Sequence, residues 1–179
     1  IMMSMRVLIG VLVGMLCIGV SSAETITVDP QEQEIPIGGT GTYYITVNCS
    51  SLDTGSHCID ISFFDASTNQ PTDKMNGSLT SSEVTLTLTE VGYGYLRYTW
   101  FADSQGTYNF TLTVWFNQSA VQVGEQFKIG IVDWNATGTD FWSSLLAYAT
   151  AYTTAIPELI TAALVGVGLA SVIIWRRWG

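Results

Sequence analysis

The chain has 179 residues, of which 47% are hydrophobic, and a formal net charge of −9. Between Glu24 and Ala155 only Lys74, Arg97 and Lys128 are basic, which excludes a nucleic-acid-binding protein because such proteins need clusters of Lys and Arg. A single histidine, with no nucleophile elbow and no close carboxylate pair in a recognisable frame, argues against an enzyme. We therefore expect a non-catalytic protein without a cofactor.

The N-terminal segment has the three-part layout of a secretory signal peptide. Arg6 is followed by the apolar run from Val7 to Val20 and then by three small residues ending at Ala23. The run is short for a membrane span and contains three glycines, so cleavage after Ala23 is favoured over an uncleaved anchor helix. Residues 1–23 are thus predicted to be removed during export.

The segment that follows is dominated by strand patterns. Seven stretches alternate polar and apolar residues with a period of two, and none between them has a helical pattern. They are 24–28, 41–48, 58–64, 84–89, 95–100, 107–116 and 126–132. Residues 66–82 are rich in turn formers, so we expect a long solvated loop there. The glycines in residues 90–94 indicate a turn or a bulge. The pattern predicts an all-β sandwich over residues 24–140.

Two stretches resemble a known fold family. The run from Asp103 through Tyr108 to Val114 resembles the turn into strand F of immunoglobulin-like domains, in which a tyrosine closes a corner by hydrogen-bonding the backbone. The run from Pro36 to Val47 is similar to the passage between the first two strands of immunoglobulin-like repeats in prokaryotic surface proteins. The resemblance implies an immunoglobulin-like sandwich of about seven strands and leaves the function open.

Cys49 and Cys58 are the only cysteines left once the signal peptide is removed. A pair of cysteines on the oxidising side of a membrane most simply forms a disulfide, here closing a short loop. The alternative is a metal site that uses His57 with one or both thiols, which lacks a second histidine or a second cysteine pair. We predict a disulfide and no metal.

Five asparagines begin an Asn-X-Ser or Asn-X-Thr acceptor sequence for N-glycosylation: Asn48, Asn76, Asn109, Asn117 and Asn135. Asn48 and Asn109 fall on the polar faces of their predicted strands, so that a glycan there would point to water. We expect these sites to be used in an archaeal or eukaryotic host, although a Thr- and Asn-rich β-protein also generates unused sequons.

Two further groups of side chains have both a functional and a structural interpretation. Trp115 falls on the outward face of its strand, where it could stack on a carbohydrate or contact a partner, or pack beneath a glycan. Four aspartates could offer oxygen ligands to calcium, but their spacing matches no known loop, so we interpret them as solvated acids. These aspartates are Asp53, Asp60, Asp65 and Asp133.

The C-terminal part of the chain is predicted to be a stalk and a membrane anchor. Residues 141–155 lack strand alternation and are interpreted as a stalk or helical extension. The segment 156–179 contains no charged residue from Leu159 to Trp175. As a helix, the span from Ile156 to Trp178 would be roughly 34 Å long, enough to cross a bilayer core of about 30 Å. Arg176 and Arg177 directly follow the apolar run, which predicts a cytoplasmic C-terminus and an exported domain.

The same tail resembles a family of sorting signals. A Pro-Glu motif at Ile156, Pro157 and Glu158, an apolar helix and a terminal basic pair together resemble the PEP-CTERM and PEF-CTERM segments of exosortase and archaeosortase substrates. The resemblance implies cleavage near Glu158 by a membrane transpeptidase. The residue after Glu158 is Leu, which departs from the commonest forms, so a plain anchor stays open.

Together these features predict an N-glycosylated cell-envelope protein with a structural, adhesive or recognition role at the surface, in contact with the membrane and with other envelope proteins or glycans. Its source is expected to be an archaeon. The alternatives are a polysaccharide-binding accessory domain that uses exposed aromatic residues and a pilin-like filament subunit. The pilin hypothesis is disfavoured because the small residues at Ser21 to Ala23 follow the apolar run.

Overall fold

The computed structural model describes residues 24–136 and 145–158. Within these residues the chain forms ten β-strands and no helix. The strands are β1 (Thr25–Asp29), β2 (Glu32–Pro36), β3 (Thr40–Cys49), β4 (Gly55–Asp65), β5 (Met75–Thr80), β6 (Thr87–Gly92), β7 (Tyr95–Ala102), β8 (Gly106–Phe116), β9 (Gln126–Asn135) and β10 (Leu145–Ile156).

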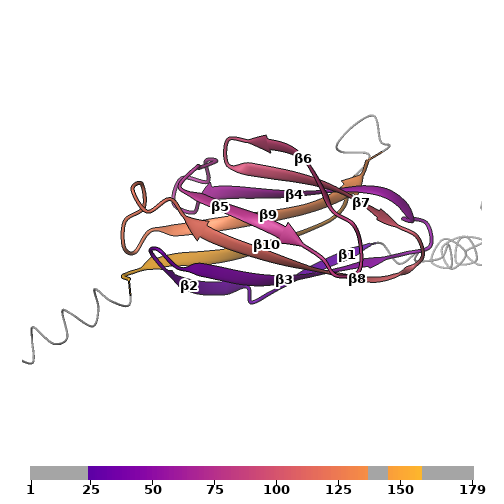
Figure 1. Cartoon of the computed structure of the whole chain (residues 1–179), viewed down its shortest axis with the longest axis horizontal. Coiled ribbons are helices and arrows are strands. Elements are labelled where there is room, and N and C mark those ends of the chain that lie inside the picture. Colours follow the sequence, from indigo (N-terminus) through magenta and orange to yellow (C-terminus); the bar gives the residue numbers. More distant parts are fainter. Residues whose placement is uncertain (1–23, 137–144, 159–179) are drawn as a thin grey trace, which may run out of the picture.

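The strands form two sheets that face each other along the length of the molecule (Figure 1). Sheet A has the strand order β1-β3-β8-β5, and sheet B has the order β2-β10-β9-β4-β7-β6. Neighbouring strands are antiparallel, except that β2 pairs with β10 in parallel. The prediction of an all-β sandwich is confirmed, and the described residues contain ten strands where about seven were expected.

The core lies between the sheets and consists of the side chains that the period of two turns inward. In β3, Tyr43, Ile45 and Val47 are fully buried, while Tyr44 and Asn48 on the opposite face are exposed. Sheet B contributes a matching inner row from β4 and β9, whose isoleucines are also fully buried. Because the inner faces of both sheets are largely removed from water, apolar burial is the main source of stability.

Two segments predicted to lie outside sheets are strands. The predicted solvated loop 66–82 contains β5, which pairs with β8 at the edge of sheet A. The predicted stalk is wrong for residues 145–155, because β10 pairs with both β9 and β2 inside sheet B. Its inward residues are small, including Ala147, Ala151 and Ala155, so the strand has none of the bulky alternation that marks β8. The sandwich therefore ends at Ile156 and not at residue 140.

The turn between β6 and β7 follows the prediction made from its glycines. Gly94 has a φ of +69°, a conformation that favours glycine. A Cβ at this position would lie 2.8 Å from the backbone oxygen of Thr72, so the close approach of a neighbouring loop also requires glycine.

The predicted signal peptide and most of the predicted membrane segment fall on residues 1–23 and 159–179, outside the described residues. Among residues 24–136 and 145–158, no helix is long and apolar enough to cross a membrane. Of the sorting motif, Ile156 is the last residue of β10, and Pro157 and Glu158 are exposed directly after it. Arg176 and Arg177 lie outside the described residues.

Candidate functional site

The outer face of sheet A is polar and contains three of the five sequons. Asn48, Asn76 and Asn109 are exposed on β3, β5 and β8, and Asn117 is exposed directly after β8. The hydroxyl of Thr107 donates to Asn48 Oδ1 over 2.7 Å, and Asn109 Nδ2 donates to Glu83 over 2.9 Å. Glycans on these asparagines would cover sheet A.

Asn135 differs from the other four sequons. It is half-buried at the end of β9, where its cross-strand partner is His57, and the side chain of His57 lies inside the sandwich. Cross-strand partners point to the same face of a sheet. Asn135 is therefore the least accessible of the five acceptors.

Trp115 lies on the outer face of sheet A, as predicted, and is 37% exposed. Its cross-strand partner on β5 is Asn76, itself a sequon. Directly opposite residues in an antiparallel pair have Cβ atoms about 4.5–5.5 Å apart. The structure thus brings the predicted ligand surface and a predicted glycan site together at one place.

The outer face of sheet B is aromatic and charged. Its outward aromatic side chains are Phe64, Tyr95, Phe101, Trp134, Tyr148 and Tyr152. Tyr148 and Phe101 are the most exposed of these, at 70% and 59%. This face also has two of the few basic residues, Arg97 and Lys128, and Lys128 lies 5.0 Å from the Phe64 ring centre.

Arg97 is the centre of an ion-pair network on that face. It donates to both carboxylate oxygens of Asp60, over 2.8 and 2.9 Å, and to Glu90 over 3.0 Å. Its guanidinium lies 4.9 Å from the ring centre of Trp134. The hydrogen bonds to Asp60 raise the pKa of Arg97 above its usual range, so the cation is held firmly in one orientation.

Cys49 and Cys58 are both free buried thiols, and the predicted disulfide is wrong. Cys49 ends β3 in sheet A and belongs to the core. Cys58 lies on β4 between His57 and Ile59, which point inward, so its side chain points to the other side of sheet B. Residues that are close in sequence are thus separated by a sheet, a placement that a disulfide geometry does not allow.

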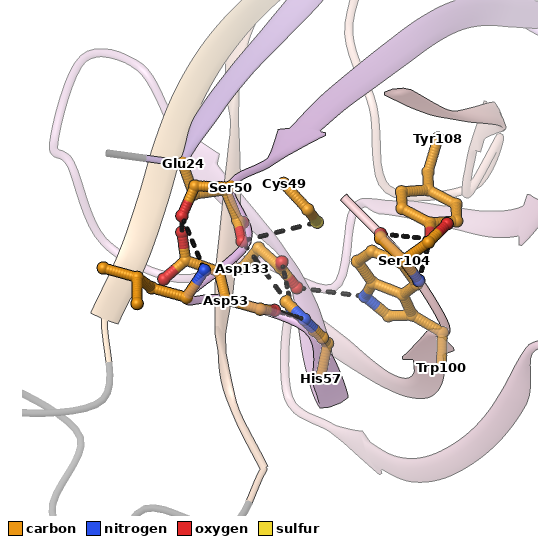
Figure 2. Close-up of polar contacts among 10 residues, drawn as sticks. Glu24, Cys49, Ser50, Asp53, His57, Trp100, Ser104, Tyr108 and Asp133 are labelled. Atoms are coloured by element: carbon orange, nitrogen blue, oxygen red, sulfur yellow. Dashed lines mark hydrogen bonds and ion pairs between the residues drawn. The ribbon is translucent and has the colours of Figure 1, made fainter. Parts of the chain in front are cut away.

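A buried polar cluster occupies the end of the sandwich where β1 begins, β3 ends and β4 begins. We define it as Glu24, Cys49, His57 and Asp133, which are between 0% and 5% exposed (Figure 2). Glu24 directly precedes β1 and Cys49 ends β3, both in sheet A. His57 and Asp133 lie on β4 and β9 of sheet B. The interpretation of Asp133 as a solvated acid is therefore wrong, and Asp60 is also buried by its pairing with Arg97.

The tautomer of His57 follows from its partners. Nε2 lies 2.6 Å from the backbone oxygen of Asp53, which can only accept, so Nε2 has the proton. With Nδ1 unprotonated, its 2.8 Å hydrogen bond with Asp133 Oδ2 is donated by the protonated carboxyl group of Asp133, and Glu24 Oε2 lies 3.8 Å from the same nitrogen. Asp53 is itself fixed by a hydrogen bond from the hydroxyl of Ser50. The imidazole is thus oriented with one nitrogen directed into the cluster.

Burial governs the protonation of the cluster. Burial and the neighbouring Asp133 raise the pKa of Glu24 to about 9, and burial raises the pKa of Asp133 to about 6. Burial lowers the pKa of His57, and burial with the charge of Glu24 raises the pKa of Cys49. Burial therefore shifts all four groups toward their neutral forms.

Trp100 connects this cluster to the hydrophobic core. Its indole Nε1 donates to Asp133 Oδ1 over 3.1 Å, and its ring centre lies 4.3 Å from that of His57 and 5.0 Å from that of Tyr108. Tyr108 hydroxyl donates to the backbone oxygen of Ser104 over 2.8 Å. That contact is the corner predicted from the immunoglobulin-like resemblance, and it is confirmed.

Sequence reasoning missed Glu24 and Asp133 as partners of His57. The three residues lie far apart in the chain, and Glu24 and Asp133 have no spacing motif. The one available signal was Asp133 itself, which follows Phe127, Ile129 and Ile131 in the alternation of β9 and so occupies an inward position.

No protein-family model matches the sequence, and no curated protein does. A cohesin module from a family 33 glycoside hydrolase of Clostridium perfringens has a TM-score of 0.50 at 12% identity, over 76% of this chain and 98% of the module. A non-cellulosomal cohesin from the hyperthermophilic archaeon Archaeoglobus fulgidus has a TM-score of 0.48 at 12% identity, over 79% and 97% of the chains. The third ScaC cohesin of Acetivibrio cellulolyticus, in complex with the ScaB dockerin, has a TM-score of 0.49 at 15% identity, over 74% and 99%. The likeness to the Clostridium module shows that this chain has a cohesin-like β-sandwich fold.

Proposed function

We propose that this chain is a non-catalytic, exported cell-envelope protein that binds another envelope protein through the outer face of sheet B, while N-glycans cover sheet A. The observation that supports this division is the difference between the two faces. Three sequons lie on sheet A, and the outward positions of sheet B contain no sequon asparagine among the described residues. A glycan-free face is available to a partner.

The composition of that face fits protein recognition. Aromatic residues and Arg are enriched at protein interfaces and at their energetic hot spots. Tyr148 and Phe101 are exposed, and the Asp60 and Glu90 carboxylates fix Arg97 before any partner arrives. A preorganised side chain loses little conformational entropy on binding. The acidic surroundings favour a partner with complementary basic groups.

We also propose how the domain is exported and attached to the membrane. A signal peptide at residues 1–23 exports the chain, and the segment 156–179 either anchors it or is cleaved by an archaeosortase-like enzyme. Pro157 and Glu158 support both routes, because they are exposed directly after the last strand and so are accessible to a membrane enzyme. Arg176 and Arg177 would hold an uncleaved helix with its end in the cytoplasm.

The buried polar cluster gives no reason to assign a catalytic activity. Its members include a histidine and two carboxylates, which are the groups that acid–base catalysis uses. They are at most 5% exposed, however, and a substrate has to reach hydrogen-bond distance of such groups to react. We therefore keep the protein in the class of binding modules.

A second candidate function is polysaccharide binding at Trp115. The exposed indole on a hydroxyl-rich strand is the observation that favours it. Loss of glycan-array binding in Trp115→Ala, with retention in Phe101→Ala, would support this alternative. Binding that is unaffected by Trp115→Ala rules it out.

Protease treatment of intact cells tests the location of the domain. We expect loss of residues 24–158 without permeabilisation, and co-purification of the released or solubilised chain with a second envelope protein. Protection of the domain in intact cells contradicts the proposed topology. Recovery of the chain only as a free monomer from envelope fractions contradicts the proposed binding function.

A further inference from the structure

We propose that Glu24, Cys49, His57 and Asp133 form a closed structural site for a zinc ion that joins the two sheets at one end of the sandwich. The inference is independent of the proposed binding function. It rests on the types of donor atom, their separations, one buried oxygen that lacks a partner and the contacts that orient the ligands (Figure 2).

The donor atoms of Glu24, Cys49 and His57 lie close to the separations that a tetrahedral ion requires. Zinc bonds of about 2.0–2.1 Å to nitrogen and oxygen and about 2.3 Å to sulfur place ligand atoms about 3.3–3.6 Å apart. Cys49 Sγ lies 3.6 Å from Glu24 Oε2, and His57 Nδ1 lies 3.8 Å from the same oxygen. The donor atoms of Glu24, Cys49 and His57 all lie within 4.8 Å of one another. Asp133 Oδ2 lies 2.8 Å from Nδ1, which is closer than two donors of one tetrahedral ion lie, so it has to move away from Nδ1 to bind as the proposed fourth donor.

Glu24 provides an independent indication of a missing ligand. Its side chain is fully buried, and Oε1 has no hydrogen-bond partner among the described residues. A buried carboxylate oxygen without a partner costs free energy. Coordination of a cation by this carboxylate removes that cost.

The surrounding contacts are those that orient metal ligands in other proteins. His57 donates Nε2–H to the backbone oxygen of Asp53 over 2.6 Å, which directs the Nδ1 lone pair into the cluster. Trp100 Nε1 donates to Asp133 Oδ1 over 3.1 Å, which leaves Oδ2 directed at the same place. Ligating histidines and carboxylates typically have such partners, which fix the tautomer and the orientation.

The donor set selects the class of ion. Calcium and magnesium require shells of oxygen ligands, whereas a thiolate with an imidazole and carboxylates suits zinc. With Glu24, Asp133 and Cys49 deprotonated and His57 neutral, three negative charges surround a dication, so most of the charge is neutralised inside the protein. The Cys49 thiol and the Glu24 and Asp133 carboxyl groups lose their protons to solvent when the ion binds.

The position of the site gives it a structural role. Glu24 precedes β1 and Cys49 ends β3 in sheet A, while His57 and Asp133 belong to β4 and β9 in sheet B. An ion bound to all four would tie the sheets together, in the part of the chain where the sequence had suggested a disulfide. Since all four ligands are at most 5% exposed, the site has no open position for a substrate.

The test uses the full chain, purified from its exporting host without added chelator. We expect elemental analysis to find one zinc per chain, and zinc to be replaceable by cobalt(II) with a thiolate-to-cobalt charge-transfer band in the near ultraviolet. Cys49→Ser should abolish that band, and Cys58→Ser is the matched control that should retain it. Removal of zinc by a chelator should lower the melting temperature, and zinc alone should restore it.

X-ray absorption on the wild-type zinc protein keeps the test valid if Cys49→Ser does not fold. We expect one sulfur and three lighter ligand atoms around the ion. A wild-type protein that binds neither zinc nor cobalt at micromolar concentrations overturns the proposal. A cobalt protein without sulfur ligation, or one whose thiolate band is lost in Cys58→Ser, overturns it equally.

Discussion

Asn76 on β5 and Trp115 on β8 are cross-strand partners on the outer face of sheet A. The first sugar of a glycan at Asn76 would therefore lie within reach of the indole and pack on it. We predict that Trp115 in Asn76→Gln is oxidised several-fold faster by a surface-labelling reagent, as followed by peptide mass spectrometry. Asn48→Gln, which removes a sequon at the opposite end of β8 from Trp115, is the control that should leave the rate unchanged. Equal rates in wild type and Asn76→Gln would show that no glycan covers Trp115.

The reactivity of Cys49 and Cys58 distinguishes two free thiols from a disulfide. Cys49 and Cys58 are 4% and 5% exposed; Cys49 points into the core between the sheets, and Cys58 points to the outer side of sheet B. We expect neither to react with Ellman's reagent in the native protein and both to react in guanidinium chloride, without prior reduction. A mature chain whose thiols are titrated only after reduction would contain the disulfide and contradict this placement.

Two substitutions at adjacent positions of β10 should differ strongly in their effect on the free energy of unfolding. Ala151 is fully buried in the core, and Thr150 is exposed on the outer face of sheet B. Ala151→Asp buries a carboxylate without a partner and should lower the free energy of unfolding by about 3–5 kcal/mol or prevent folding. Thr150→Asp should change it by less than about 0.5 kcal/mol. Chemical denaturation of both variants measures the difference, and equal small effects would restore the stalk hypothesis for residues 145–155.

The corner at Tyr108 should contribute measurably to stability. Its hydroxyl donates to the backbone oxygen of Ser104 and accepts from the backbone nitrogen of Ser104 over 3.2 Å, and the residue is buried. Tyr108→Phe leaves these backbone groups without that partner and should cost about 1–2 kcal/mol. Tyr44→Phe, on the exposed face of β3, is the matched control and should cost nothing measurable. Thermal unfolding of the two variants measures this difference. Equal melting temperatures would show that the Tyr108 hydroxyl contributes nothing to stability.

Strands with bulky inward residues were predictable from the sequence, and those without them were not. β8 alternates Tyr108, Phe110, Leu112, Val114 and Phe116 with polar residues, and the structure has it as expected. β10 turns alanines inward and alternates them with Tyr and Thr, so its hydrophobic contrast is weak. β2 and β5 are short and polar at edges of their sheets, and they are strands because their neighbours offer hydrogen-bond partners.

The candidate site was harder to predict from the sequence than the strands, because it depends on which strands and sheets come together. The alternation predicted that Asn48, Asn109 and Trp115 face outward, and the structure confirms this for all three. It could not predict that Glu24, His57 and Asp133 meet, because their proximity results from the pairing of β4 with β9 and from the stacking of two sheets. The same stacking separates Cys49 from Cys58, which the short loop between them had suggested to be joined.

The central claim is that the outer face of sheet B, and not that of sheet A, contacts a protein partner at the cell surface. A photo-crosslinking amino acid placed at Tyr148 tests it most directly, with the same replacement at Tyr44 as the matched control. These tyrosines are 70% and 59% exposed, on sheets B and A. Illumination of intact cells should give a discrete crosslinked envelope protein from position 148 and none from position 44. Crosslinks from position 44 alone, or from neither position, would contradict the proposed docking face.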